Sequence, residues 1–195
     1  MTRRTALLST AVVASAHSQS RPTPVIVDTD AGTDDLMAIA FLLARPDIRV
    51  EAITVANGLA HVDRGAANLI RLLTLAGEPD IPVYAGRPSP MSGDRVFPEE
   101  WRSTSDNLPG VPLPSPKRYP ERERAVDFLL RRLTRTASDP VRILALGPLT
   151  NLGEMLQHSP AAALIVRQLV IMGGALHVPG NLGDGGAFKT DNKTA

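Results

Sequence analysis

Short apolar runs alternate with helical patterns along the 195-residue chain, and this alternation limits the possible folds more than any other feature. Five runs have the length and composition of strands, at residues 25–27, 50–55, 81–84, 141–146 and 168–172. Between them the apolar spacing predicts helices over 34–45, 64–76, 121–135 and 149–156. Strands that are separated by helices form βαβ units, in which the strands run parallel. We therefore predict an α/β fold, with a mainly parallel, Rossmann-like open sheet flanked by helices, in a single domain over 21–195.

One stretch, residues 87–120, breaks this pattern. It contains eight prolines and shows no apolar periodicity, so we expect a long loop there rather than a helix or strand. A loop of this length can cover a substrate site or can simply run over the surface.

Composition excludes several classes of function. The formal net charge of +1 provides no basic field for nucleic acid, and 4% aromatic residues are too few to stack on a series of bases. The absence of cysteine excludes disulfides, thiolate metal sites and cysteine nucleophiles.

The first twenty residues look like a targeting segment. Arg3 and Arg4 precede a short apolar run that ends in the small residues 14–16, as in a secretory signal peptide. The run is shorter than the roughly 20 residues that span a bilayer, so no membrane span is expected. We expect residues 1–20 to be a signal peptide of an exported, periplasmic or secreted protein; the alternative is a disordered N-terminal extension of a cytoplasmic protein.

Four carboxylates follow the first predicted strand, at Asp28, Asp30, Asp34 and Asp35. Two such charges about 4 Å apart repel by roughly 4 kcal/mol at an effective dielectric constant near 20. With no lysine or arginine close in sequence, a hard divalent cation such as Ca²⁺ or Mg²⁺ would compensate the charge with oxygen ligands. Alternatively, Asp34 and Asp35 complement the positive end of the next helix while Asp28 caps the turn.

Two known motifs begin in a similar way. An EF-hand loop counted from Asp28 needs glycine and glutamate where Thr33 and Ile39 stand, which excludes it. Haloacid-dehalogenase-type phosphatases also begin with Asp-x-Asp after a strand, but they lack the Asp34–Asp35 pair, so they are a distant alternative.

The order of several motifs is more specific than any one of them. The segment from Asp28 to Asp35 is followed in order by Ile53–Gly58, Pro82–Gly86, Ala145–Asn151 and Val170–Gly174. Together they resemble the inosine-uridine-preferring nucleoside hydrolase family over nearly all of the chain from Val25 to Asn181. The resemblance implies the nucleoside-hydrolase fold and the calcium-dependent hydrolysis of a ribonucleoside to ribose and free base.

The resemblance also implies roles for individual residues. Asp30, Asp35 and the backbone carbonyl of Thr150 would be calcium ligands, and Asp30 would also be the general base. The residues expected to contact or orient the substrate are Asp34, which would hold a ribose hydroxyl, Asn57, Asn181 and the supporting Asp28.

The sequence departs from the family pattern in two places. Asn57–Gly58 stands where the family commonly has Gly-Asn, which shifts the amide by one position. The chain ends at Ala195, before a sugar-binding segment and a C-terminal His–Asp pair, and none of its four histidines is identified as a substitute. We therefore expect a domain whose C-terminal part is missing. The alternative function is a non-catalytic remnant that binds a ribosylated ligand or a protein partner. Family members also suggest a homo-oligomer, and their bases include purines and pyrimidines.

Overall fold

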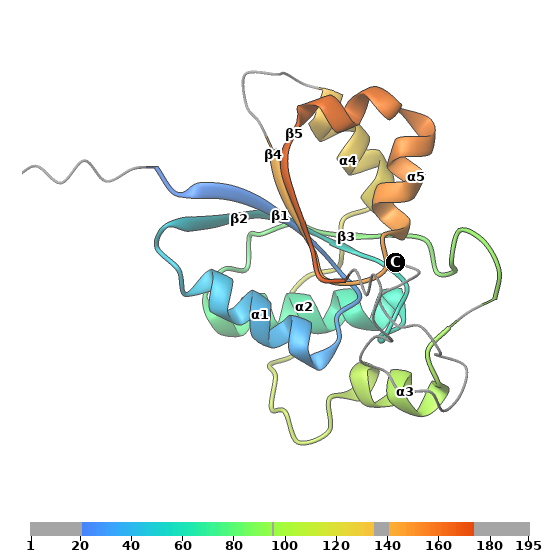
Figure 1. Ribbon diagram of the computed structural model, residues 1–195. Helices are drawn as coiled ribbons and strands as arrows, with labels where there is room; N and C mark the ends of the chain where they lie inside the picture. Colours follow the sequence, from blue (N-terminus) through green and yellow to red (C-terminus); the bar gives the residue numbers. More distant parts are fainter. Residues whose placement is uncertain (1–20, 95, 135–140, 174–195) are drawn as a thin grey trace, which may run out of the picture.

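A five-stranded parallel sheet forms the centre of the protein, as a computed structural model shows for residues 21–94, 96–134 and 141–173 (Figure 1). The strand order is β3-β2-β1-β4-β5. Every pairing is parallel, which confirms the predicted sheet. The strands are β1 (Thr23–Thr29), β2 (Ile48–Val55), β3 (Val83–Ala85), β4 (Val141–Ala145) and β5 (Val166–Ile171).

Helices cover both faces of the sheet (Figure 1). α1 (Thr33–Leu43) and α2 (Val62–Ala76) lie on one face, and α4 (Ala125–Thr134) and α5 (Thr150–His158) lie on the other. A short 3-10 helix, η1 (Pro160–Ile165), leads from α5 into β5. α2 ends where predicted, because Gly77 adopts the left-handed conformation (φ 79°) that closes a helix.

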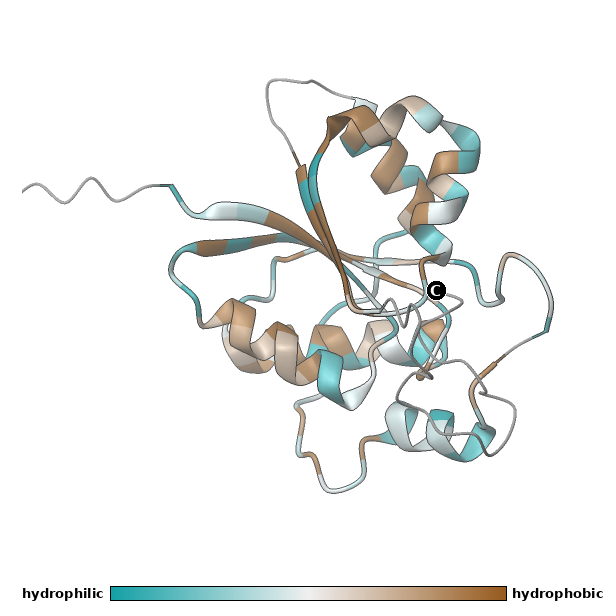
Figure 2. Cartoon of the chain, in the orientation of Figure 1, coloured by the Kyte–Doolittle hydropathy of each residue, from teal (hydrophilic) through white to brown (hydrophobic). Residues whose placement is uncertain are grey.

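The side chains of the strands alternate between two apolar cores. Val27 and Ile53 pack with α1 and α2, whereas their neighbours Ile26 and Ala52 pack with α4 and α5. Both faces of the central strands are therefore buried over the second half of β1 and β2, where most of the side chains are apolar (Figure 2).

The prediction of a structureless loop over 87–120 was wrong, because this stretch contains α3 (Glu99–Asn107). Its buried side chains are Arg102 and Ser105, so the helix has no apolar stripe that a sequence pattern could reveal. The next helix begins at Ala125 rather than at residue 121. Glu121 is held in an extended conformation, because its N–H donates to the Val83 carbonyl at 2.8 Å.

The side of the sheet to which the chain adds its strands changes at β1. It first adds β2 and β3 on one side, then crosses to add β4 and β5 on the other. In open parallel sheets, ligands bind beyond the carboxyl ends of the strands at such a switch point. A site is therefore expected beyond the carboxyl ends of β1 and β4.

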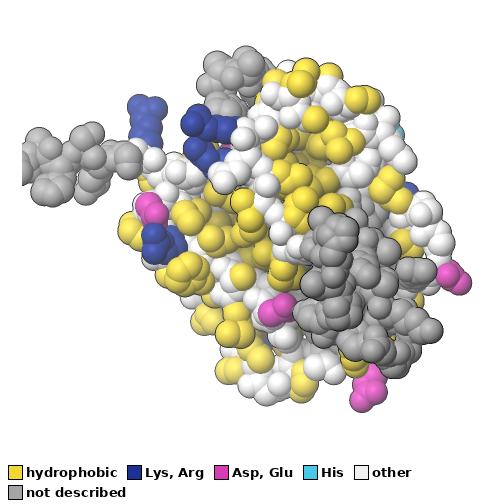
Figure 3. Space-filling model, in the orientation of Figure 1, with side chains coloured by type: hydrophobic (Ala, Val, Ile, Leu, Met, Phe, Trp, Pro, Cys, Tyr) yellow, Lys and Arg dark blue, Asp and Glu magenta, His cyan; other side chains and the backbone are white. Residues whose placement is uncertain are grey.

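At the outer side of the sheet, β5 pairs only with β4 among the described strands. Its residues Leu169, Val170 and Ile171 are partly exposed, and exposed apolar side chains gather on the face seen in Figure 3. Among the described residues, no helix combines the length and hydropathy needed to cross a membrane. The predicted signal segment, residues 1–20, lies outside the described residues.

Leu129 lies fully buried in the core beneath α4, so Leu129→Ala should lower the free energy of unfolding by about 2–5 kcal/mol. Leu164→Ala makes the same change where the side chain is 87% exposed, and should cost no more than about 0.5 kcal/mol. Urea unfolding followed by circular dichroism measures both. Equal losses in the two variants would contradict the described core.

Candidate functional site

The carboxylate of Asp28 joins the central strand to the neighbouring strand β2 and to helix α5. It is fully buried near the end of β1, and its Oδ1 accepts hydrogen bonds from Thr54 Oγ1 on β2 at 2.5 Å and from Asn151 Nδ2 on α5 at 2.8 Å. Burial raises the pKa of Asp28 to about 6, and the two hydrogen bonds oppose that shift. Its Oδ2 has no hydrogen-bond partner among the described residues.

Asp30 and Asp35 form a second acidic group beside Asp28. Asp30 Oδ2 accepts the N–H of Leu59 at 2.9 Å, and Asp35 Oδ2 accepts the hydroxyl of Thr29 at 2.5 Å. Burial raises the pKa of both carboxyl groups, and repulsion from Asp30 contributes to a pKa of about 8 for Asp35. In the part of the chain that the structure describes, no lysine or arginine is bonded to these carboxylates. The pair is therefore suited to hold a proton or a cation.

Two glycines allow neighbouring loops to close around Asp30. A Cβ atom on Gly58 would lie 2.1 Å from Asp30 Oδ2, and one on Gly147 would lie 2.7 Å from the backbone nitrogen of Asp30. The loop after β2 and the loop after β4 can approach this carboxylate only because neither residue has a side chain.

The turn between Asp30 and α1 is strained. Ala31 has a φ of 56°, a left-handed conformation that a residue with a side chain adopts at a cost of about 1–3 kcal/mol. The Thr29 hydroxyl accepts the Ala31 N–H at 2.9 Å and helps to hold the turn. Strain of this kind, between two buried carboxylates, is typical of a functional site.

The other predicted site residues lie in different environments. Asp34 is exposed in the first turn of α1, and a Cβ on Gly32 would lie 2.8 Å from its Oδ1, so its carboxylate leans over the Gly32 turn. Thr150 is buried at the start of α5, beside Asn151. The structure thus brings Asp28, Asp30 and Asp35 together, with Thr150 at the same edge of the sheet, whereas Asn181 lies outside the described residues.

The candidate metal ligands described at this edge are all oxygen atoms. Within the described ranges no group of three or more His, Cys, Asp or Glu side chains could hold a metal ion. The predicted ligand set requires only two carboxylates and a backbone carbonyl. The buried and unpartnered Asp28 Oδ2 and Asn151 Oδ1 add further acceptors to the region. Such a donor set fits a hard cation such as Ca²⁺.

A pocket of about 260 Å³ opens at the same edge of the sheet, and Asp28, Asp30 and Asp35 are not among its lining residues. It lies beyond the ends of β2 and β3, and it is lined by Asn57, His61, Val62, Asp63, Ala85, Gly86 and Pro88. Two of its lining segments are connected to the acidic group through neighbouring residues. Leu59, in the loop between Asn57 and His61, binds Asp30, and a Cβ on Gly86 would lie 2.2 Å from Asn151 Oδ1.

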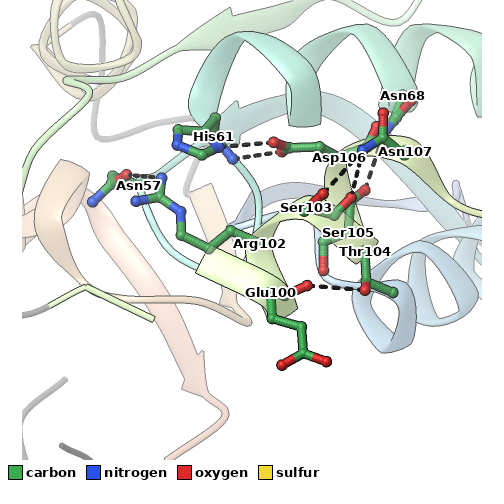
Figure 4. Close-up of polar contacts among 10 residues, drawn as sticks. All are labelled: Asn57, His61, Asn68, Glu100, Arg102, Ser103, Thr104, Ser105, Asp106 and Asn107. Carbon is green, nitrogen blue, oxygen red and sulfur yellow. Dashed lines mark hydrogen bonds and ion pairs between the residues drawn. The ribbon is translucent and has the colours of Figure 1, made fainter. Parts of the chain in front are cut away.

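Helix α3 supplies two contacts to this pocket that the sequence analysis missed (Figure 4). Arg102 Nη2 donates to Asn57 Oδ1 at 2.8 Å. Asp106 accepts the backbone N–H of His61 at 2.9 Å and lies 2.8 Å from its ring Nδ1. Arg102 and Asp106 are four residues apart, a spacing that places both on one face of a helix. That spacing was the only signal available, and it becomes meaningful only once a helix is recognised there.

The comparisons with known proteins agree with this geometry. The model of a family described as inosine-uridine preferring nucleoside hydrolase matches residues 25–187. The chain belongs to this family. The match favours the nucleoside-hydrolase interpretation of the acidic motif over the haloacid-dehalogenase one.

The named relatives align with this chain over about half of their own length. A pyrimidine-specific ribonucleoside hydrolase of Salmonella schwarzengrund is 37% identical over 78% of this chain and 49% of its own. Similar solved structures are a plant nucleoside hydrolase (TM-score 0.74, 35% identity, 83% of this chain and 51% of the other) and the purine-preferring ribonucleoside hydrolase of Gardnerella vaginalis (TM-score 0.73, 28% identity, 83% and 52%). The chain thus spans about half the length of the curated relatives that it matches.

Gly147→Ala should disturb the site of this nucleoside hydrolase family member, because its Cβ would meet the backbone of Asp30 rather than a side chain that can move aside. We expect a loss of about 1–3 kcal/mol in the free energy of unfolding. Gly153→Ala is the matched control within α5. There the nearest atom is the flexible Met91 Sδ, and alanine favours the helix, so stability should be unchanged or increased. Thermal unfolding of the pair tests whether the β4–α5 loop packs against Asp30.

Proposed function

We propose that the protein hydrolyses the N-glycosidic bond of ribonucleosides to give ribose and the free base. The observation that carries this proposal is the group of buried carboxylates, Asp28, Asp30 and Asp35, at the switch point of the sheet with no cationic side chain bonded to them in the described ranges. The names of the relatives, which are ribonucleoside hydrolases, support the same reaction.

A calcium ion fits the donors of this site. Asp30, Asp35 and the backbone carbonyl of Thr150 would hold it, and the ion would supply a Lewis acid that makes water a stronger nucleophile and offsets the repulsion between the carboxylates. This proposal accounts for two buried acidic side chains whose pKa values are raised in the protein alone.

In this proposal Asp30 is the general base. The Leu59 N–H fixes its Oδ2, and the Gly58 and Gly147 loops leave little room for its side chain to turn. A carboxylate in this position accepts the proton of the attacking water. As the glycosidic bond breaks, positive charge develops on the ribosyl ring, and the neighbouring carboxylates stabilise it.

The remaining residues bind and orient the sugar. Asp34 is exposed at the start of α1, where its carboxylate can accept a hydrogen bond from a ribose hydroxyl. Asp28 fixes the side chains of Thr54 and Asn151 and so holds the ends of three neighbouring elements in register. Because relatives are named for pyrimidines in some cases and purines in others, substrate tests should include both.

Replacement of the general base tests the reaction. Asp30→Asn should lower kcat by about 10²–10⁴-fold, because the amide cannot accept the proton from water. The control Asp47→Asn changes an exposed aspartate that is paired with Arg45, and it should leave kcat unchanged. Release of reducing sugar from inosine, guanosine, uridine and cytidine in CaCl₂ measures both. If the wild-type protein binds ribose and calcium but releases no base, the non-catalytic alternative is favoured.

Calcium binding can be tested without turnover. Asp35→Asn removes one charged ligand, so calorimetry should show calcium affinity reduced by at least about tenfold, since affinity follows the number and charge of the ligands. In the wild-type protein, calcium should raise the Tm, because it binds the folded state. The same affinity in Asp35→Asn and in the Asp47→Asn control would exclude Asp35 as a ligand.

A further inference from the structure

The pairing of Arg102 with Asn57 determines which end of the Asn57 amide faces the guanidinium. A guanidinium carries N–H donors and no acceptor, so only the amide oxygen can bond to it. The observed contact, Arg102 Nη2 to Asn57 Oδ1 at 2.8 Å, meets this requirement. Both residues are 94% buried, so water competes little for the bond. The amide NH₂ group is the part of Asn57 that is left for a ligand.

That NH₂ group belongs to a side chain that lines the 260 Å³ pocket. Within the described ranges it donates to no other residue, so its hydrogen-bonding capacity is available there. In Figure 4 the amide nitrogen of Asn57 points away from Arg102. Asn57 therefore offers an N–H donor at the lining of the pocket, which an acceptor atom of a ligand can bind.

Helix α3 is itself held firmly, so Arg102 has a defined position. Asn68 Nδ2, on α2, donates to the carbonyls of Ser105 and Asp106 at 3.2 and 2.9 Å. Asp106 binds both the backbone and the ring of His61 at the start of α2. These contacts attach the C-terminal half of α3 to α2 and leave Arg102 to reach across to Asn57.

The loop that carries Asn57 also contacts Asp30. Leu59, two residues after Asn57, donates its backbone N–H to Asp30. A sugar whose anomeric carbon lies near Asp30 presents hydroxyl oxygens to the adjoining pocket. We propose that Arg102 is a positioning residue: it turns the NH₂ group of Asn57 into the pocket, where this group donates to a ribose hydroxyl oxygen. This inference rests on the proposed function.

The first experiment measures recognition of single hydroxyl groups without any reaction. Calorimetry in CaCl₂ compares D-ribose with its 2-deoxy, 3-deoxy and 5-deoxy analogues. In the wild-type protein, loss of one hydroxyl should weaken binding at least about fivefold, the effect of one hydrogen bond. In Arg102→Met the same deletion should weaken binding less than about twofold, since a freely turning amide no longer favours that oxygen. Equal discrimination in both proteins overturns the inference.

Three further variants distinguish positioning of the Asn57 amide from a general loosening of the 87–120 segment. Arg118→Met removes another arginine of this segment, one that donates to the carbonyls of Pro79 and Ile81 and, among the described residues, has no hydrogen bond to α3, and it should keep the discrimination. Arg102→Lys retains one donor and should restore part of it. Asn57→Asp keeps a partner for Arg102 but has no NH₂ group, and it should lose the discrimination. Loss in Arg118→Met equal to that in Arg102→Met would contradict a specific role for Arg102.

A ligand-free measurement distinguishes failure of this inference from failure of the proposed function. In protein labelled with ¹⁵N-asparagine, the side-chain NH₂ signals of Asn57 are those lost in Asn57→Ser. We expect them to be rigid in the wild-type protein and to fall below an order parameter of about 0.6 in Arg102→Met. Unchanged signals overturn the positioning role. If the wild-type protein binds neither ribose nor nucleosides, the proposed function fails, and these signals still decide whether Arg102 fixes the amide.

Discussion

Burying a carboxylate at the end of the central strand is the constraint that organises this protein. The charge of Asp28 leaves water, and the protein compensates with a hydroxyl from β2 and an amide from α5. Those two donors come from opposite sides of β1, so the requirement of one side chain fixes three elements relative to one another. The same arrangement then confines Asp30 between two loops that glycines allow to approach.

Much of the fold could be predicted from the sequence, because the apolar core determines it. All five described strands overlap the predicted ranges, and the parallel sheet follows from helices between them. The acidic part of the site was also predictable, since Asp28, Asp30 and Asp35 lie in one short segment after a strand. Their proximity follows from local chain geometry and needs no knowledge of tertiary contacts.

The second half of the site could not be predicted for a physical reason. α3 buries a guanidinium and a hydroxyl instead of an apolar stripe, and prolines on both sides obscure it. Its contacts to Asn57 and His61 each join residues 45 positions apart in the chain. Neither Arg102 nor Asp106 belongs to a local motif. A polar helix of this kind derives its stability from the partners it finds in the fold, so it leaves little trace in hydrophobic periodicity.

The place of β1 in the chain has a consequence for biosynthesis. Among the described strands, the one at the centre of the sheet is synthesised first, whereas β4, which covers its second edge, follows only after the whole segment from Thr29 to Val141. At ordinary rates of translation this delay is on the order of ten seconds. During that time the aspartates after β1 remain hydrated and one edge of the strand is open to other chains. The pairing of β4 with β1 then covers that edge, and α5, which follows β4, brings the amide of Asn151 to Asp28.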